Sequence, residues 1–192
     1  IGSLLRTRPR NLDEITIQVA IVRPGPIVGG AVNPYIERLQ RLSRADESYA
    51  DGVGVLFCDL DRLKEINDAH GHLAGDTVLT AVASRLAAAV RGSDDVGRLG
   101  GDEFVVLLHG VGSTEDLRRV ANKIRLKVSR SVIVGGAVID VTISVGAALM
   151  RPGEQTRTVL QRADDALLQA KSQGRDRVVV AEPEPAQGAT PL

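Results

Sequence analysis

An uninterrupted apolar run, Val53 to Cys58, constrains the fold of this chain more than any other feature. A run of this length is short enough to be a strand that is buried within a sheet. The segment Asp59-Leu60-Asp61 follows the run directly and places two carboxylates at its end. The sequence therefore predicts a sheet with acidic side chains at the edge where its buried strand ends.

The other periodic segments of the chain alternate between helical and strand patterns. Asp76 is expected to cap a helix or to lie in its first turn. This order of elements predicts an α+β fold in which helices surround a central mixed sheet. Helices are predicted over 34–45, 62–69, Val78 to Val90, the segment that follows Ser113 up to Val128, and 159–170. Strands are predicted at 96–99, 103–108, 141–145 and 178–180, the first two as a hairpin around Gly100-Gly101.

The composition limits the kind of protein this can be. Aromatic residues make up 2% of the 192 residues, so the core is expected to consist of Leu, Val, Ile and Ala. The formal net charge is +0, which argues against a general nucleic-acid or membrane-surface binder, because such proteins carry a basic excess. Cys58 is the only cysteine, and one cysteine fits a cytoplasmic setting.

Three regions differ in composition. Residues 1–33 are irregular and are expected to be an extension or a linker from an upstream module, with a strand where apolar residues alternate between 15 and 21. Residues 34–181 form the predicted domain. Residues 182–192 carry Pro, Gly, Ala and Thr with little to bury, and they are expected to be a disordered tail.

The carboxylates suggest a metal site. If the first strand lies beside the hairpin, then Asp59, Asp61, Asp102 and Glu103 converge at one edge of the sheet. Hard oxygen ligands of this kind suit Mg²⁺ or Mn²⁺, which bridge to substrate phosphates. The alternative is that these are strand-end carboxylates that face water, which is the usual position of charged side chains.

The hairpin glycines also have two interpretations. Gly100 and Gly101 would let a phosphate approach backbone N–H groups with no Cβ in the way. They would equally serve a turn that requires positive φ. A P-loop sequence is absent from the chain, so phosphate would not be held in that manner.

Four ordered motifs across residues 53–180 resemble those of the GGDEF family. The family fold, and hence the expected fold, is a ferredoxin-like sheet with surrounding helices, similar to polymerase palm and class III nucleotidyl cyclase domains. The motifs are Arg98-Leu99-Gly100-Gly101-Asp102-Glu103-Phe104, the block from Asp59 to Asp68, Gly71-His72-Leu73-Ala74-Gly75-Asp76, and Arg162-Ala163-Asp164 followed by Ala170 to Arg175.

The resemblance implies a diguanylate cyclase, which condenses two GTP molecules into cyclic di-GMP and releases two pyrophosphates. By this resemblance Asp59, the carbonyl of Leu60 and Asp102 hold Mg²⁺ or Mn²⁺, and Glu103 acts with Asp102 in catalysis by orienting or activating the attacking hydroxyl. The guanine would be read by Asn67 and Asp76, whose alternative roles are a short-helix terminus and a helix cap. Phosphate contacts are implied for Lys64, Gly100, Gly101, Lys171 and Arg175.

The resemblance also implies partners and a product site. Arg91-Gly92-Ser93-Asp94 resembles the family's R-x-x-D inhibitory site, where Arg91 would grip the product and Asp94 would accept a hydrogen bond from guanine. A surface loop is the alternative. Each domain would supply half a catalytic site, so a homodimer is expected, with an upstream sensory or regulatory domain. A catalytically silent cyclic di-GMP receptor is the competing function, and no nucleic-acid partner is expected.

Overall fold

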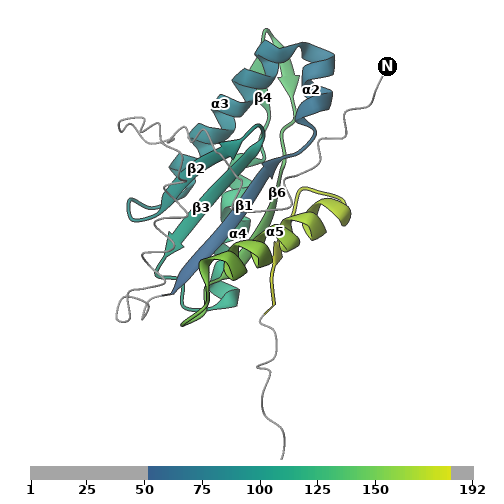
Figure 1. Cartoon of the computed structure of the whole chain (residues 1–192). Helices are drawn as coiled ribbons and strands as arrows, with labels where there is room; N and C mark the ends of the chain where they lie inside the picture. The colour runs from purple at the N-terminus through teal and green to yellow at the C-terminus, as the bar shows by residue number, and fades with distance from the viewer. Residues whose placement is uncertain (1–51, 183–192) are drawn as a thin grey trace, which may run out of the picture.

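The structure, a computed structural model, describes residues 52–182 (Figure 1). The predicted extension 1–33 and helix 34–45, together with the tail after residue 182, lie outside the described residues. In chain order the elements are β1 Val53–Leu60, α2 Leu63–His70, α3 His72–Ala89, β2 Asp95–Gly100, β3 Glu103–His109, α4 Thr114–Val128, β4 Val132–Val134, β5 Ala137–Ile139, β6 Ile143–Leu149, α5 Thr156–Ser172 and β7 Val178–Val180.

The main sheet has five strands in the order β2-β3-β1-β6-β7. β1 pairs antiparallel with both β3 and β6, while β6 and β7 are parallel. The chain crosses from β1 through α2 and α3 to β2, forms the β2–β3 hairpin, and returns through α4 to β6, which gives the ferredoxin-like arrangement. The predicted α+β fold with a central mixed sheet is therefore confirmed.

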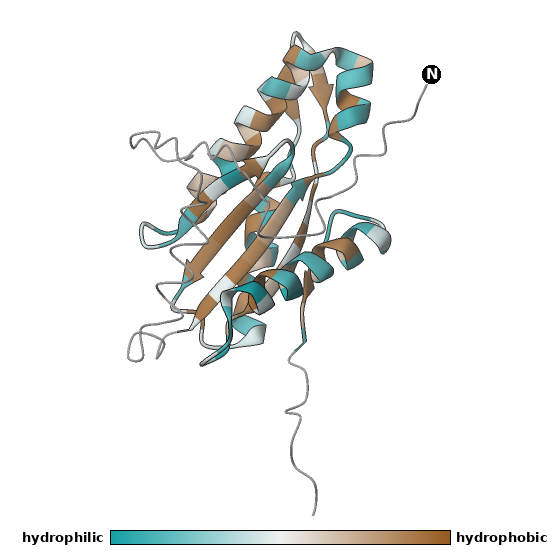
Figure 2. Cartoon of the chain, in the orientation of Figure 1, coloured by the Kyte–Doolittle hydropathy of each residue, from teal (hydrophilic) through white to brown (hydrophobic). Residues whose placement is uncertain are grey.

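Side chains of β1 alternate between two cores, as successive residues of a strand must. Leu56, Cys58 and Leu60 belong to the larger apolar cluster, which includes residues of α3 and α4. Val55 and Phe57 belong to the second cluster, which includes residues of α5. Figure 2 shows the apolar strands enclosed between helices whose outer surfaces are polar. The prediction of a strand buried on both faces is correct, and the odd-numbered residues of β1 face α5.

Helix α5 lies unusually close to the sheet at Gly146 of β6. A Cβ built on Gly146 would stand 2.1 Å from the backbone N of Leu167 and 2.2 Å from the backbone O of Ala163. Such distances exclude any side chain. The backbone of α5 therefore rests directly on the backbone of β6.

Two predicted boundaries are wrong. Helix α3 begins at His72 after Gly71, so Asp76 lies in its second turn and neither caps it nor lies in its first turn. Strand β6 runs from Ile143 to Leu149, whereas alternation favoured 141–145. The strand is buried on both faces, and its second half is built of small residues that give no alternating signal.

The short hairpin of β4 and β5 was not predicted. Its signal was present, because two apolar triplets flank Gly135-Gly136, and such a pair is typical of a two-residue hairpin turn. Arg85 of α3 secures the chain before it, since its guanidinium donates to the carbonyls of Arg130 at 2.5 Å and Ser131 at 2.8 Å. Among the described residues, none of the helices is both long enough and apolar enough to cross a bilayer.

Candidate active site

Asp59 ends the α5-facing row of β1 and is almost fully buried, with its side chain 5% exposed. Its Oδ2 lies 2.5 Å from Nζ of Lys171, in the last turn of α5. Burial raises the pKa of Asp59 from 3.8 to about 6, Lys171 opposes the rise, and the charges of Asp102 and Glu103 add to it. Burial disfavours the ionised form of Asp59, and a further positive charge beside it would stabilise that form.

The hairpin of β2 and β3 brings its own carboxylates to this edge. Glu103 is the direct cross-strand partner of Asp59, and opposite residues of an antiparallel pair place their side chains on the same face. The backbone N–H of Leu60 donates to the carbonyl of Asp102 at 3.0 Å, which fixes the turn against β1. Gly101 in that turn has a φ of 52°, the conformation that the turn interpretation required.

Asp61 does not share these contacts. Its buried carboxylate accepts hydrogen bonds from the hydroxyls of Thr142 at 2.8 Å and Ser144 at 2.7 Å, and from the backbone N–H of Asp176 at 3.2 Å. Its oxygens are therefore used to hold the start of β6 and the loop after α5. Asp59, Asp102 and Glu103 lie close enough for their charges to interact, as predicted. The prediction is wrong for Asp61, whose carboxylate is directed to β6 and the loop after α5.

The predicted guanine-reading residues lie on adjoining helices. Asn67 of α2 packs onto α3 at Gly75, where its Oδ1 occupies the space that a Cβ would fill. That Oδ1 is buried and has no hydrogen-bond partner within the described residues. Asp76, the next residue of α3, is exposed. The helix-cap alternative for Asp76 is removed, and the Asn67 oxygen is a buried polar atom of the kind that usually has a partner.

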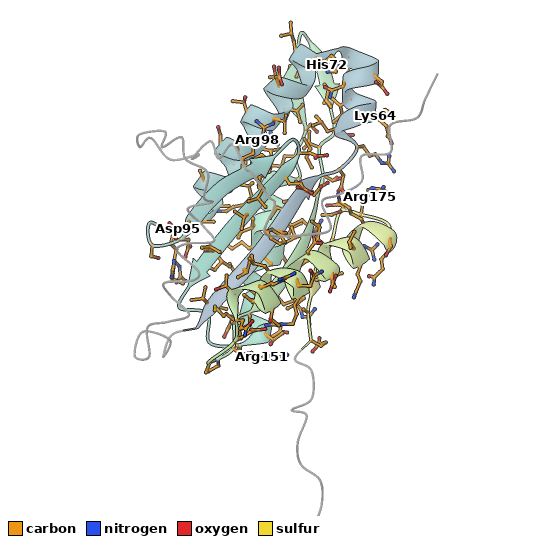
Figure 3. All side chains as sticks on the ribbon, viewed as in Figure 1. Lys64, His72, Asp95, Arg98, Arg151 and Arg175 are labelled. Carbon is orange, nitrogen blue, oxygen red and sulfur yellow. The ribbon has the colours of Figure 1, made fainter. Side chains whose placement is uncertain are left out.

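Predicted phosphate-binding cations surround this edge. Lys64 and Arg175 are exposed and lie on the side of the molecule where β1 passes into α2 (Figure 3). Lys171 is the cation already paired with Asp59. Arg98, which was not assigned a role beyond its place in the motif, donates to the carbonyl of Gly101 through Nε at 2.9 Å and so stabilises the hairpin turn.

The predicted product site lines a separate cavity of about 320 Å³, between the end of α3, the end of β3 and α4. Arg91, Asp94 and Lys123 are among its lining residues. Asp94 is buried, and its carboxylate accepts from the backbone N–H groups of Arg91 at 2.8 Å and His109 at 3.1 Å. The surface-loop alternative therefore does not describe Asp94, whose carboxylate shapes the turn that presents Arg91.

The donor set suits a divalent cation. Asp59 and Asp102 could supply oxygen ligands. The pKa of Asp59 is raised mainly by burial and further by the charges of Asp102 and Glu103, and a cation beside these carboxylates would offset both effects. Within residues 52–182, His, Cys, Asp and Glu side chains do not form a preassembled group of three or more that could hold a metal ion. A cation held here would therefore take part of its coordination from backbone carbonyl and substrate oxygens.

The family model described as the diguanylate cyclase GGDEF domain matches residues 35–177. The chain belongs to the GGDEF family. A second model, the finger domain of the bacterial DNA polymerase III alpha subunit, matches residues 2–55, which lie almost wholly outside the described residues.

Curated GGDEF relatives agree with this assignment. The chain is 40% identical over 147 residues to the diguanylate cyclase TpbB of Pseudomonas aeruginosa, which covers 76% of this chain and 34% of TpbB. It is 43% identical over 133 residues to the response regulator PleD of Caulobacter vibrioides, covering 67% of this chain and 29% of PleD. The chain thus spans about a third or less of the length of these relatives.

Solved GGDEF structures show the same fold. A truncated TpbB from Pseudomonas aeruginosa, comprising only its GGDEF domain, superposes with a TM-score of 0.72 at 39% identity, covering 77% of this chain and 87% of that one. The GGDEF domain of DgcB from Caulobacter crescentus, in complex with c-di-GMP, gives a TM-score of 0.72 at 28% identity, covering 84% and 99%.

Proposed function

We propose that this GGDEF domain is a diguanylate cyclase that joins two GTP molecules into cyclic di-GMP and releases two pyrophosphates. The observation that carries the proposal is the buried Asp59 opposite Glu103, with its pKa raised to about 6 and Lys171 against it. Relatives named as diguanylate cyclases support it.

The acidic edge supplies the groups that the reaction needs. Asp59, the Leu60 carbonyl and Asp102 would hold Mg²⁺ or Mn²⁺, which when bound offsets phosphate charge and favours ionisation of the attacking 3′-hydroxyl. Glu103, on the same face as Asp59, would accept the hydroxyl proton or orient the hydroxyl. The new bond joins the 3′-oxygen to the α-phosphorus, and the bond to pyrophosphate breaks.

Asn67 and Asp76 would select guanine. The Asp76 carboxylate accepts from the N1–H and N2–H₂ groups, which adenine does not offer in that arrangement. The Asn67 oxygen depends on the bare backbone of Gly75 for its position. We expect Gly75→Ala to displace Asn67 and to lower the preference for GTP over ATP, measured by competition for product formation.

Lys64, Lys171 and Arg175 would bind the triphosphate, with the Gly100-Gly101 backbone close to it. Lys171 would then exchange part of its contact with Asp59 for phosphate oxygens as the cation takes over the carboxylate. The exposed positions of Lys64 and Arg175 allow both to reach a ligand without a change in the core.

One domain holds one GTP, so two domains must face each other for the two condensations. We propose a homodimer of half-sites, with activity that rises steeply with protein concentration. Control by another domain or protein fits this requirement, and the diguanylate cyclase SiaD of Pseudomonas aeruginosa has been solved in complex with its activator SiaC.

The test is incubation of the chain with GTP and Mg²⁺ or Mn²⁺, with the product identified by mass. Cyclic di-GMP and pyrophosphate are expected, and Asp102→Asn should abolish both while the melting temperature remains close to that of the unmodified chain. Absence of product from a folded chain at high concentration would contradict the proposal.

The cavity at Arg91 favours a second role, binding of the product. A cavity of about 320 Å³ with cations from both the α3–β2 turn and α4 suits a cyclic dinucleotide, and a DgcB structure holds c-di-GMP. Arg91→Ala should then relieve product inhibition without slowing synthesis. Cyclic di-GMP binding that Arg91→Ala abolishes, in a chain that makes no product, would instead identify a silent receptor.

A further inference from the structure

The Asp61 carboxylate joins three segments that are far apart in the sequence. Its hydroxyl partners, Thr142 and Ser144, are at the start of β6, and the N–H of Asp176 comes from the loop between α5 and β7. The backbone N–H of Asp61 also donates to the carbonyl of Thr142 at 3.0 Å. The end of β1 is therefore tied on one side to β6 and on the other to the loop that carries Arg175.

Asp176 is held from the opposite direction by α4. Nη1 of Arg125 lies 2.6 Å from Oδ1 of Asp176 and 3.1 Å from its carbonyl oxygen. The hydroxyl of Ser129 donates to the same Oδ1 at 3.2 Å. The Arg125 side chain is only 17% exposed, while that of Asp176 is 44% exposed, so the guanidinium is held in place and the carboxylate remains open to solvent. Asp176 is thus hydrogen-bonded through its N–H, its carbonyl and its side chain.

The loop that contains Asp176 has an unfavourable backbone conformation. Gly174, Arg175 and Asp176 follow one another with φ of 114°, 64° and 41°. Residues other than glycine rarely adopt the left-handed region, and they stay there only when their surroundings enforce it. The N–H of Arg175 also donates to the carbonyl of Ala170 at 3.0 Å, which fixes the loop to the end of α5.

We propose that Asp176 is a positioning residue for triphosphate binding. Its hydrogen bonds with Asp61 and Arg125 hold the neighbouring Arg175 in the left-handed conformation that directs it to the substrate. The inference rests on the proposed function, in which Arg175 contacts the triphosphate. Loss of the contacts to Asp176 would let the Arg175 backbone relax toward the extended region, and its guanidinium would leave the side of the molecule that Lys64 shares.

The test separates an effect through Arg175 from a general loss of structure. The probes are GTP with a methylene group between its α- and β-phosphorus atoms, which cannot lose pyrophosphate, and GMP, which lacks the outer phosphates. Calorimetry in Mg²⁺ measures both. Asp176→Ala should weaken the analogue roughly tenfold, the size of one charge-assisted contact, and should leave GMP affinity within about twofold.

A double-mutant cycle decides the point. In the Arg175→Ala background, Asp176→Ala should cost no further affinity for the analogue, because its effect passes through Arg175. Asp176→Asn should retain most of the affinity, since Asn tolerates the left-handed backbone and its Oδ1 still accepts from Arg125. Arg125→Met removes these hydrogen bonds and leaves the sequence of the loop unchanged. It should weaken the analogue as Asp176→Ala does, which keeps the test valid if Asp176→Ala folds poorly.

The matched control is Arg118→Met, also on α4, whose ion pairs with Glu115 and Glu182 are exposed and do not involve the loop. It should leave both affinities unchanged. Equal losses from Asp176→Ala in the presence and absence of Arg175 would overturn the positioning role alone. A folded unmodified chain that binds neither probe would refute the proposed function, and with it the inference.

Discussion

Helix α5 carries two partly buried cations, Arg162 and Lys171, whose pairings with carboxylates differ in geometry. Arg162, in its first half, donates to both oxygens of Glu154 and to the carbonyl of Leu149. Lys171, in its last turn, pairs with the carboxylate of Asp59. Glu154 also accepts from the N–H of Arg151, so the first pair is surrounded by hydrogen bonds.

The difference lies in what surrounds each carboxylate. Glu154 has a bidentate partner of matching shape, and its pair joins α5 to the loop before it and to the end of β6. Asp59 faces Asp102 and Glu103, whose charges work against Lys171. Arginine thus closes a structural contact, whereas lysine, a compact point charge, makes the contact that we propose is exchanged for phosphate oxygens.

The largest expected effect is on activity at Asp59. Asp59→Asn should lower GTP condensation by a factor of about 10³ or more, because the site loses the carboxylate that would hold the cation. Glu154→Gln, in the other pair, should retain near-normal turnover per folded molecule. Product formation measured at equal folded concentration checks this, and similar losses in the two variants would erase the contrast between the pairs.

The next effect is on stability at Arg162. Arg162→Ala should lower the free energy of unfolding by about 3–5 kcal/mol, because Glu154 is left buried without its counter-ion. Urea denaturation monitored by circular dichroism measures the change. Removing both partners should cost less than the sum of the single losses, and strict additivity would show that the pair is not coupled.

At Asp59 a smaller change in the free energy of unfolding is expected, opposite in sign to that of Arg162→Ala. Its pKa is raised in the folded state, so the neutral form favours folding below pH 3.8 and that advantage is lost as the pH rises through about 6. Asp59→Asn should therefore stabilise the chain at pH 7 by up to about 3 kcal/mol, since Lys171, at 28% exposed, can turn to water. The gain should vanish below about pH 4, and a loss of stability at pH 7 would contradict the assignment.

The smallest expected effect is a displaced pH profile. Where Mg²⁺ is limiting, synthesis should increase as the pH rises through about 6, because Asp59 must ionise before it can hold the cation. Lys171 holds that pKa down, so Lys171→Met should move the acidic limb to higher pH, by about one unit. The measurement is kcat/KM between pH 5 and 8. An unmoved limb would mean that another group governs it.

How much could be predicted from sequence depended on whether a signal was local. The buried strand Val53–Cys58, the carboxylates after it and the glycine turn at Gly100-Gly101 are contiguous patterns, and the structure reproduces them. The role of Asp61 was mistaken because its partners are 81, 83 and 115 residues away. The carboxylate has the same chemistry as Asp59, and only the fold separates the two.

Other errors arose where two local interpretations competed. Asp76 has the residue type of a helix cap, but Gly71 had already allowed the chain to turn and α3 to begin earlier. Arg125 and Asp176 gave no signal, since each is an ordinary charged residue until α4 and the loop after α5 are packed together. Sequence resemblance located the motif residues, whereas the contacts that hold them in place required the structure.

The bare backbone contact at Gly146 has a consequence for how such sequences can diverge. Because α5 rests on β6 with no side chain between them at that point, the height of the helix above the sheet is set by the main chain. A side chain at position 146 would lift α5 from β6 and change the reach of Lys171 to Asp59, so sequences that keep this contact are expected to keep glycine there.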